Sequence, residues 1–290
     1  MIVDAHVHLY PDAVNADPAA WAHAAGEPHW AHLSTRRRRD GRPVQSFPAL
    51  ADLLRAMDAA GVDRAVLLGW YWQRPETCAQ QNRFYADCVR AHPDRLSAFA
   101  TIHPAAGPAA TMAEVDRAAG EGLCGLGELS PHAQGFDIDD PVLAEVLARA
   151  AGLRWPVNLH VTDPASRPFP GRIETRLADF TTLARRWPEL RFVLAHWGGL
   201  LPVTDPATVA DCPNLYYDTA ASPLLYAPEI WPRLLAALPP GRVLFGSDFP
   251  LHLYPRLAAE PGLERLVAEA RAGGADAAVL GGNARALLGR

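Results

Sequence analysis

The chain has 290 residues, of which 49% are hydrophobic and 20% charged, and its formal net charge at pH 7 is -5. These values exclude a disordered or collagen-like chain, and the slightly acidic balance argues against a nucleic-acid-binding protein, which usually presents a basic face. No apolar run approaches the ~20 residues of a bilayer-spanning helix, and the first residues lack the profile of a signal peptide. We therefore expect a cytoplasmic protein with neither nucleic acid nor a membrane as partner.

Short apolar runs bounded by glycine, proline or charge recur along the whole chain and alternate with stretches of helical periodicity. The predicted strands are Ile2–His6, Asp63–Gly69, Leu96–Ile102, Gly122–Glu128, Pro156–His160, Arg191–His196, Leu215–Asp218 and Arg242–Ser247. The predicted helices include Pro48–Ala60, Gln80–Ala91, Ala109–Glu121, Pro141–Ala151, Thr175–Trp187, Pro223–Leu238 and Gly262–Ala272.

Strands that alternate in this way with helical crossovers are typical of a (β/α)₈ TIM barrel, which takes ~250 residues. We therefore expect an α/β fold with one barrel domain over residues 1–290. A doubly wound parallel sheet is the alternative, because it shows the same alternation of strands and helices. Polar residues at the strand ends favour the barrel, since these ends meet at one mouth where active sites lie. These residues are His6, Glu128, His160, His196, Asp218 and Asp248.

The segment from residue 10 to residue 47 interrupts the alternation directly after the first strand. It contains prolines, tryptophans and the arginine run Arg36–Arg39, and it precedes the first predicted helix. Long irregular segments inside a compact domain are usually functional or disordered. We expect residues 10–47 to be a loop insertion that forms an active-site lid. A second irregular stretch, Thr162–Ile173, follows the fifth strand and is also rich in proline and arginine.

The strand ends carry residue types that bind metal ions. His6 and His8 are two apart in a strand, so both imidazoles point the same way and can approach one ion. His160, His196 and Asp248 each follow a further apolar strand. Four imidazoles and a carboxylate can form the ligand set of zinc or a similar divalent ion. The alternative for each residue alone is a polar group that bonds nearby backbone at a strand end.

With the closing sequence Gly281-Gly282-Asn283-Ala284-Arg285-Ala286-Leu287-Leu288, these motifs resemble the amidohydrolase superfamily. The nearest branch is the amidohydrolase-2 group, which includes aminocarboxymuconate semialdehyde decarboxylase and several lactone or amide hydrolases. The resemblance implies one or two divalent metal ions, with zinc as the first choice. It implies further that the metal is held by His6, His8 and Asp248, with His160 as an additional ligand.

The resemblance also implies catalytic roles for two residues. Asp248 would double as the general base that receives a proton from water, because a carboxylate that touches both the metal and the water suits that transfer. His196 would be either a ligand of a second metal or, in single-metal members, a catalytic acid. We therefore assign Asp248 and His196 as the candidate catalytic residues.

One departure from the superfamily concerns the fourth strand. Many of its hydrolases bridge two metals with a carboxylated lysine there, whereas all 27 basic residues of this chain are arginine. The motif Gly125-Leu126-Gly127-Glu128 has a glutamate instead. Glu128 either binds or bridges a second metal, or it hydrogen-bonds a ligating histidine beside a single metal. A purely structural glutamate is the third option.

The evidence for substrate contacts is thinner. Trp70 and Trp72 follow the second strand and Trp197 follows His196, so these rings could line a pocket, although packing under loops explains them equally well. Arg167 and the run Arg36–Arg39 belong to the two irregular segments, where guanidinium groups suit carboxylate recognition. The alternative for the arginine run is a solvated face.

Three functions are compatible with these features. The first is a metal-dependent hydrolase in which metal-activated water attacks a small amide, ester or lactone carbonyl. The second is a non-oxidative decarboxylase of an unsaturated or aromatic carboxylic acid. The third is a metal-binding barrel without catalysis, against which the intact ligand set argues. In each case the expected partner is a small molecule, and a homo-oligomer is left open.

Overall fold

The computed structural model describes residues 1–164 and 166–289. All eight predicted strands are confirmed, although most are shorter than predicted. They are β1 (Val3–Val7), β2 (Arg64–Leu67), β3 (Leu96–Ala98), β4 (Leu126–Leu129), β5 (Val157–Leu159), β6 (Phe192–Leu194), β7 (Leu215–Asp218) and β8 (Val243–Leu244). Each strand pairs in parallel with the next within two sheets, β1-β2-β3 and β4-β5-β6-β7-β8.

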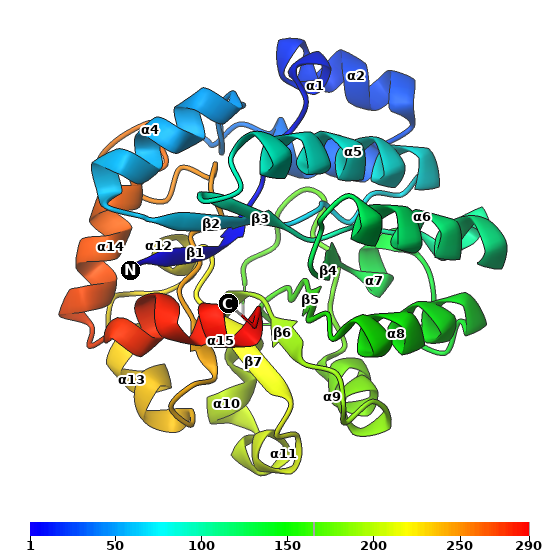
Figure 1. The fold of residues 1–290 in the computed structure, drawn as a ribbon. Coiled ribbons are helices and arrows are strands. Elements are labelled where there is room, and N and C mark those ends of the chain that lie inside the picture. The colour runs from blue at the N-terminus through cyan, green and yellow to red at the C-terminus, as the bar shows by residue number, and fades with distance from the viewer. Residues whose placement is uncertain (165, 290) are drawn as a thin grey trace.

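Two isolated parallel bridges join the sheets at both edges, one between Val7 and Phe249 and one between Ala100 and Leu126. The strands therefore follow one another around the fold in chain order, with helices outside them (Figure 1). A doubly wound sheet reverses its strand order at a switch point, and no reversal occurs among the described strands. The fold is thus the expected (β/α)₈ barrel.

The helices outside the strands confirm the predicted pattern with one difference. The predicted helix Pro223–Leu238 is two helices, α12 (Ser222–Leu225) and α13 (Ile230–Ala237), because the chain between them contains Pro228. The other helices after the insertion are α4 (Leu50–Ala60), α5 (Pro75–Ala91), α6 (Pro108–Gly120), α7 (Pro131–Gln134), α8 (Pro141–Leu153), α9 (Leu177–Arg186), α10 (Leu201–Thr204), α11 (Pro206–Asp211), α14 (Leu263–Ala272) and α15 (Asn283–Leu287). No helix of the described residues is long and apolar enough to cross a bilayer.

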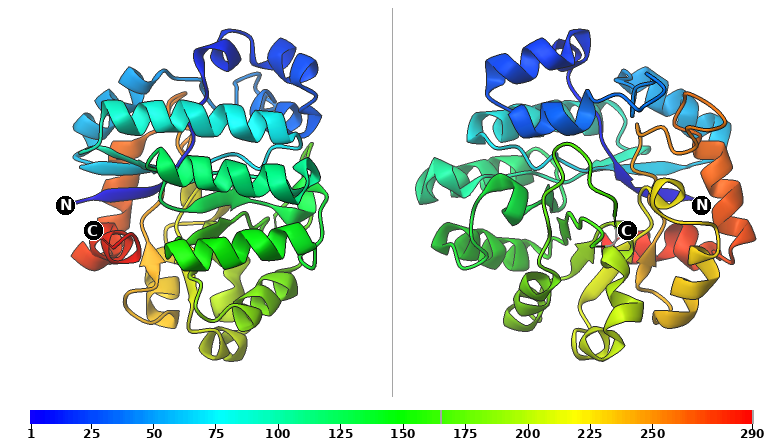
Figure 2. Two further views of the ribbon diagram at one scale, coloured as in Figure 1. Left: turned by 45° about the vertical axis from the view of Figure 1, so that its right-hand side comes forward. Right: turned by 180° about the vertical axis from the view of Figure 1, so that it is seen from behind.

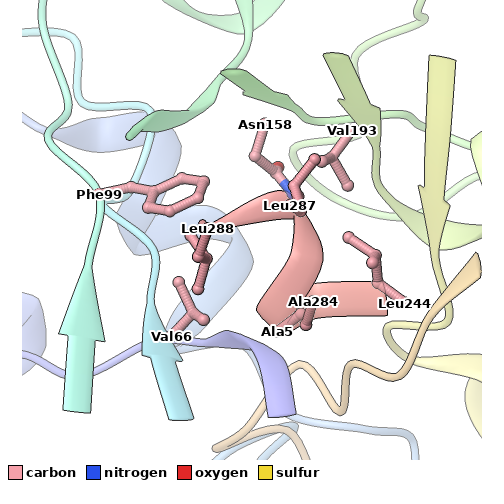
Figure 3. A pocket seen from close by; sticks show the side chains of 9 residues that line it. All are labelled: Ala5, Val66, Phe99, Asn158, Val193, Leu244, Ala284, Leu287 and Leu288. Atoms are coloured by element: carbon pink, nitrogen blue, oxygen red, sulfur yellow. The ribbon is translucent and has the colours of Figure 1, made fainter. Parts of the chain in front are cut away.

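The interior of the barrel is apolar at the end where the strands begin. Side chains from five strands meet there and pack against Ala284 and Leu287 of α15. They leave a cavity of only about 10 Å³, around which Figure 3 shows the lining side chains. A larger apolar core lies between the strands and the surrounding helices. Because α15 closes this end, any solvent-accessible chemistry belongs to the opposite end of the barrel.

The insertion after β1 is present, but it is more regular than expected. It contains the short helices α1 (Asp12–Ala16), α2 (Pro18–Ala25) and α3 (Pro28–Ser34), which lie beside α5 (Figures 1 and 2). Their boundaries follow ordinary signals, since the Asp17 carboxylate accepts a hydrogen bond from the amide of Ala20, and Gly26 ends α2 at φ 72°.

The insertion is fastened to the barrel by an aromatic cluster and by a buried carboxylate. Tyr10 and Trp30 pack with Trp72, which follows β2. The Glu27 carboxylate accepts hydrogen bonds from two backbone amides of residues 73–74. Residues 10–47 are therefore packed as part of the barrel's upper face.

Candidate active site

The two histidines of β1 converge on one point. The Nε2 atoms of His6 and His8 lie 3.1 Å apart, and both rings are buried. Their other nitrogens are engaged elsewhere, because His6 Nδ1 contacts the Asp218 carboxylate at 2.9 Å and His8 Nδ1 contacts the carbonyl oxygen of Leu68 at 3.0 Å. Donation from Nδ1 leaves Nε2 of each ring as the nitrogen that can bind a cation.

Asp218, at the end of β7, makes contacts that the sequence did not reveal. Its Oδ2 accepts hydrogen bonds from His6 Nδ1 at 2.9 Å and from the side-chain nitrogen Nδ2 of Asn158 at 3.2 Å. Its Oδ1 accepts hydrogen bonds from the backbone amides of His196 and Ala220 at 3.0 and 3.1 Å. The sequence placed Asp218 among the strand-end residues, and the structure adds that its carboxylate contacts His6.

Two carboxylates complete the surroundings of the histidine pair. Asp248, just beyond β8, has Oδ1 at 3.8 Å from Nε2 of His6 and at 3.6 Å from Nε2 of His8. Glu128, in β4, has Oε2 at 3.9 and 3.7 Å from the same two nitrogens. Donors from three strands that are far apart in the chain therefore surround one position.

The remaining two predicted histidines lie beside this group. His160 Nδ1 is 3.0 Å from Oε1 of Glu128, so the glutamate links His160 to the histidine pair. His196 Nδ1 is 3.1 Å from the carbonyl oxygen of Ala220 and 3.9 Å from Oδ2 of Asp248. The candidate ligand atoms form two close groups, one of His6, His8 and Asp248 and one of Glu128, His160 and His196.

The electrostatics of this cluster favour bound positive charge. Burial by itself lowers the pKa of the His6 imidazole, but the carboxylates of Asp218 and Glu128 outweigh burial and raise that pKa. Burial likewise tends to raise the pKa of Glu128, yet the fields of His160 and His6 hold that pKa well below its usual range. A proton on His6 is stabilised by charges that a metal cation at the same position would also feel.

The backbone near the two candidate catalytic residues is unusual. His196 and Asp248 are non-glycine residues at φ 56° and 66°. This left-handed conformation costs roughly 1–3 kcal/mol and is concentrated at functional sites. Gly246, two residues before Asp248, has no room for a side chain, because a Cβ atom there would lie 2.8 Å from Cβ of His6. The motif Gly246-Ser247-Asp248 thus lets the chain after β8 pass close to β1.

A cavity of about 820 Å³ opens above these side chains. His8, Glu128, His160, His196 and Asp248 lie at its base, and the insertion and the loop after β5 form much of its wall. Six arginines line it, namely Arg36, Arg37, Arg38, Arg167, Arg172 and Arg256. The cavity is large enough for a small organic molecule.

Arg36 differs from the arginines that are tied to neighbours. It is half-buried, and its Nε is buried with no hydrogen-bond partner among the described residues. Its guanidinium lies 4.6 Å from the ring centroid of Phe169, in the loop after β5. By contrast, Arg172 donates to the hydroxyl of Ser166 at 3.0 Å. Arg38, which also lines the cavity, has an unpartnered Nε as well, but Arg36 is the one whose guanidinium is also held over an aromatic ring.

The four residues predicted to contact substrate divide into two pairs. Trp70 and Arg167 line the cavity, and the Trp70 ring lies 5.3 Å from that of His8. Trp72 and Trp197 are fully buried and are not among the described residues that line the cavity. Trp72 donates to the side chain of Gln81, and Trp197 donates to Ser222. Both indoles therefore serve packing, and neither is retained as a substrate contact.

The residues present fit a divalent cation. Two imidazole nitrogens 3.1 Å apart, with two carboxylate oxygens within 4 Å of each, supply the mixed nitrogen and oxygen donors that such ions take in proteins. The histidines are also oriented by outer contacts, as is usual for metal ligands. One carboxylate oxygen of Glu128 faces the histidine pair and the other contacts His160, so these contacts are compatible both with a metal ligand and with a residue that orients a ligating histidine.

Comparisons with known proteins agree with the barrel fold. No curated protein matches the sequence. Among solved structures, 5-carboxyvanillate decarboxylase LigW from Sphingomonas paucimobilis is 19% identical, with a TM-score of 0.72 and coverage of 99% of this chain and 98% of that one. A probable 2-pyrone-4,6-dicarboxylic acid hydrolase from Acinetobacter baumannii, solved with citric acid bound, is 15% identical, with a TM-score of 0.63 and coverage of 100% and 99%.

A third structure, 2,6-dihydroxybenzoate decarboxylase complexed with 2,6-dihydroxybenzoate, is 18% identical, with a TM-score of 0.65 and coverage of 100% of this chain and 99% of that one. At these identities the likeness concerns the fold. The family model described as Amidohydrolase matches residues 3–290, which is nearly the whole chain. The chain therefore belongs to the amidohydrolase family of metal-dependent enzymes, in its amidohydrolase-2 branch.

Proposed function

We propose that this protein is a metal-dependent hydrolase that adds water to the carbonyl of a small amide, ester or lactone bearing a carboxylate. The observation that carries the proposal is the position of Asp248 between the histidine pair and His196. Its Oδ1 lies within 4 Å of both histidine Nε2 atoms, and its Oδ2 lies 3.9 Å from His196 Nδ1. A carboxylate in that position can receive a proton from water held at the metal position.

The proposed ligands are His6, His8, Asp248 and Glu128, with His160 completing the set, and zinc is the ion that suits these donors first. When bound, such an ion supplies polarisation of the substrate carbonyl and a lowered pKa for water. Hydrolysis needs a base for the water proton and an acid for the leaving group. Asp248 has the position of the base.

His196 has the position of the acid. Its Nδ1 donates to the carbonyl of Ala220, so Nε2 is the ring atom available in the cavity. In that arrangement a protonated His196 can give its Nε2 proton to the leaving nitrogen or oxygen. The acid and base therefore lie next to each other on the same side of the cavity.

The carboxylate on the substrate is inferred from the arginines of the cavity. Arg36 offers a half-buried guanidinium whose Nε lacks a partner among the described residues. Its pKa is lowered first by burial and then by the nearby positive charge of Arg38. Guanidinium groups bind carboxylates in a planar, two-point geometry. Arg167 and Trp70 are the further substrate contacts that we propose.

A second candidate function rests on the same arginines. Non-oxidative decarboxylation of an unsaturated or aromatic acid also needs a bound carboxylate beside the metal, and the aromatic face of Trp70 suits such a substrate. The fold neighbours include decarboxylases and a hydrolase, so they favour neither reaction. We rank hydrolysis first because Asp248 and His196 supply both proton-transfer groups. A metal-binding barrel without catalysis is ranked last, since none of the predicted ligand positions carries a residue that cannot bind a metal.

The other expectations from the sequence stay as proposals. Residues 1–290 form one domain in which residues 10–47 act as a lid, supported by the cavity wall that this segment forms. The protein works in the cytoplasm on a small molecule. A homo-oligomer is compatible with the proposal and is not needed by it, because the candidate ligands all come from one chain.

The test combines metal content with a substrate panel. We expect elemental mass spectrometry of gently purified protein to give one or two ions per chain, and Glu128→Gln to lose one ion if Glu128 is a ligand of a second metal. Carboxylated lactones and amides should yield a new acid group without gas. Release of carbon dioxide with loss of a conjugated chromophore would replace hydrolysis by decarboxylation. Absence of metal after reconstitution with zinc would refute both.

A further inference from the structure

Asn158 is a polar residue in the apolar interior of the barrel. It lies in the middle of β5, two residues before His160, so both side chains point to the same side of the strand. Around it are Val66, Phe99, Val193, Leu244 and Leu287, which line the small cavity above α15 (Figure 3). An asparagine among these side chains breaks the apolar pattern of the interior.

The two ends of the Asn158 amide meet different surroundings. The nitrogen donates to Oδ2 of Asp218 at 3.2 Å, whereas Oδ1 is buried without a hydrogen-bond partner among the described residues. The carboxylate determines this orientation, because a flipped amide would direct its oxygen against the oxygen of Asp218. Burial of an unpaired amide oxygen costs desolvation free energy. Such a cost persists where the other half of the group has a function.

The oxygen that Asn158 contacts is the same one that receives His6. Oδ2 of Asp218 accepts from His6 Nδ1 at 2.9 Å and from Asn158, while Oδ1 accepts from two backbone amides. Four donors hold this carboxylate in one rotamer. A fixed acceptor at Nδ1 keeps the proton on Nδ1 and turns Nε2 of His6 toward His8 and Asp248.

We propose that Asn158 is a positioning residue for the metal centre, acting through Asp218 on the orientation of His6. The inference rests on the proposed metal-binding function, but it concerns metal affinity and ligand geometry rather than the reaction. By this proposal, a residue in the apolar interior affects how tightly the site at the mouth of the barrel binds its metal ion.

The variant Asn158→Leu tests the proposal, because leucine has the same branched shape and number of side-chain heavy atoms and removes both the hydrogen bond and the unpaired oxygen. We expect this variant to be at least as stable to heat as the wild type, yet to bind Co²⁺ roughly 10- to 100-fold more weakly. Apo protein would be titrated with Co²⁺ against a chromophoric chelator, and the visible spectrum of the cobalt protein would report the ligand geometry. Asn158→Ala is the second variant if leucine prevents folding.

The matched control is Asn214→Ala. Asn214 is also buried and donates to the backbone carbonyls of Ala184, Trp187 and Leu190, but it does not contact a metal donor. We expect this control to lose stability and to keep the cobalt affinity and spectrum. The double variant with Asp218→Asn should bind no more weakly than Asp218→Asn alone, because Asn158 acts through that carboxylate.

The outcomes separate this proposal from the function on which it rests. If the wild type binds neither Co²⁺ nor Zn²⁺, the metal centre itself is wrong and the role of Asn158 is refuted with it. If the wild type binds Co²⁺ and Asn158→Leu binds it equally tightly with the same spectrum, only the positioning role is refuted.

Discussion

The two ends of the barrel interior are built from opposite kinds of side chain. At the mouth, His6, His8 and Glu128 are buried together although each is polar or ionisable. At the closed end, Phe99 and Leu287 pack with other apolar side chains around a cavity of about 10 Å³. The same strands supply both layers, so residues a few positions apart in one strand belong to different chemical environments.

The closed end therefore stabilises the fold, whereas the mouth lowers its stability. Apolar burial at the closed end stabilises the fold at roughly 25 cal/mol per Å². The mouth instead gathers like-charged carboxylates and carries residues in the left-handed conformation, among them His196 and Asp248, which cost stability. We expect substitutions at the mouth to change metal binding and activity, and substitutions of the apolar side chains at the closed end to change stability alone.

The largest effect is expected from Asp248→Asn. Loss of the carboxylate removes a metal donor and the proposed base, so kcat/KM should fall by about 10³-fold or more. Steady-state assays and elemental analysis would be run beside Asp12→Asn, which changes an exposed aspartate of α1. Unchanged activity in Asp248→Asn would remove the site assignment.

His196→Gln should have the next largest effect. Glutamine cannot exchange a proton, so kcat should fall about 10²-fold if the ring is the general acid. The metal content should stay at the wild-type value, which elemental mass spectrometry would check. Loss of one ion per chain would instead make His196 a ligand of a second metal. The exposed His23→Gln is the matched control.

A smaller effect is expected at the wall of the cavity. Arg36→Met should raise KM for a carboxylated substrate roughly 10- to 100-fold, because a hydrogen bond to a charged group is worth about 1.5–3 kcal/mol. The value of kcat should change little, since the contact is the same in the ground and transition states. Arg39→Met, an exposed position of the same run, should leave both constants unaltered. An equal KM in the two variants contradicts the proposed anion contact.

The smallest effect on activity is expected at the closed end. Leu287→Ala removes a buried side chain from α15 and should lower the free energy of unfolding by about 2–5 kcal/mol. The folded fraction should keep its kcat and its metal content, because Leu287 touches no metal donor. Denaturant unfolding would be compared with Leu257→Ala, whose side chain is 62% exposed. A large loss of kcat at unchanged stability would break the contrast between the two ends.

Much of this protein was determined by its sequence alone. Alternating strand and helix patterns are local properties of the chain, so all eight strands and the barrel could be predicted from them. His6, His8, Glu128, His160, His196 and Asp248 could be predicted as neighbours as well, because parallel strands direct their carboxyl ends to one mouth. Residues 10–47 look irregular in sequence, whereas the structure has three short helices there. Short helices that are held by tertiary contacts have weak periodicity, so the pattern did not predict them.

Only the tertiary structure decided which side chains face each other across the barrel. Trp70 and Trp72 are equivalent candidates in sequence, yet only Trp70 lines the cavity, because the insertion packs over Trp72. The role of Asp218 likewise depends on His6, which lies 212 positions away in the chain. Contacts between distant segments arise from how the elements pack, and local patterns carry no record of a partner so far along the chain.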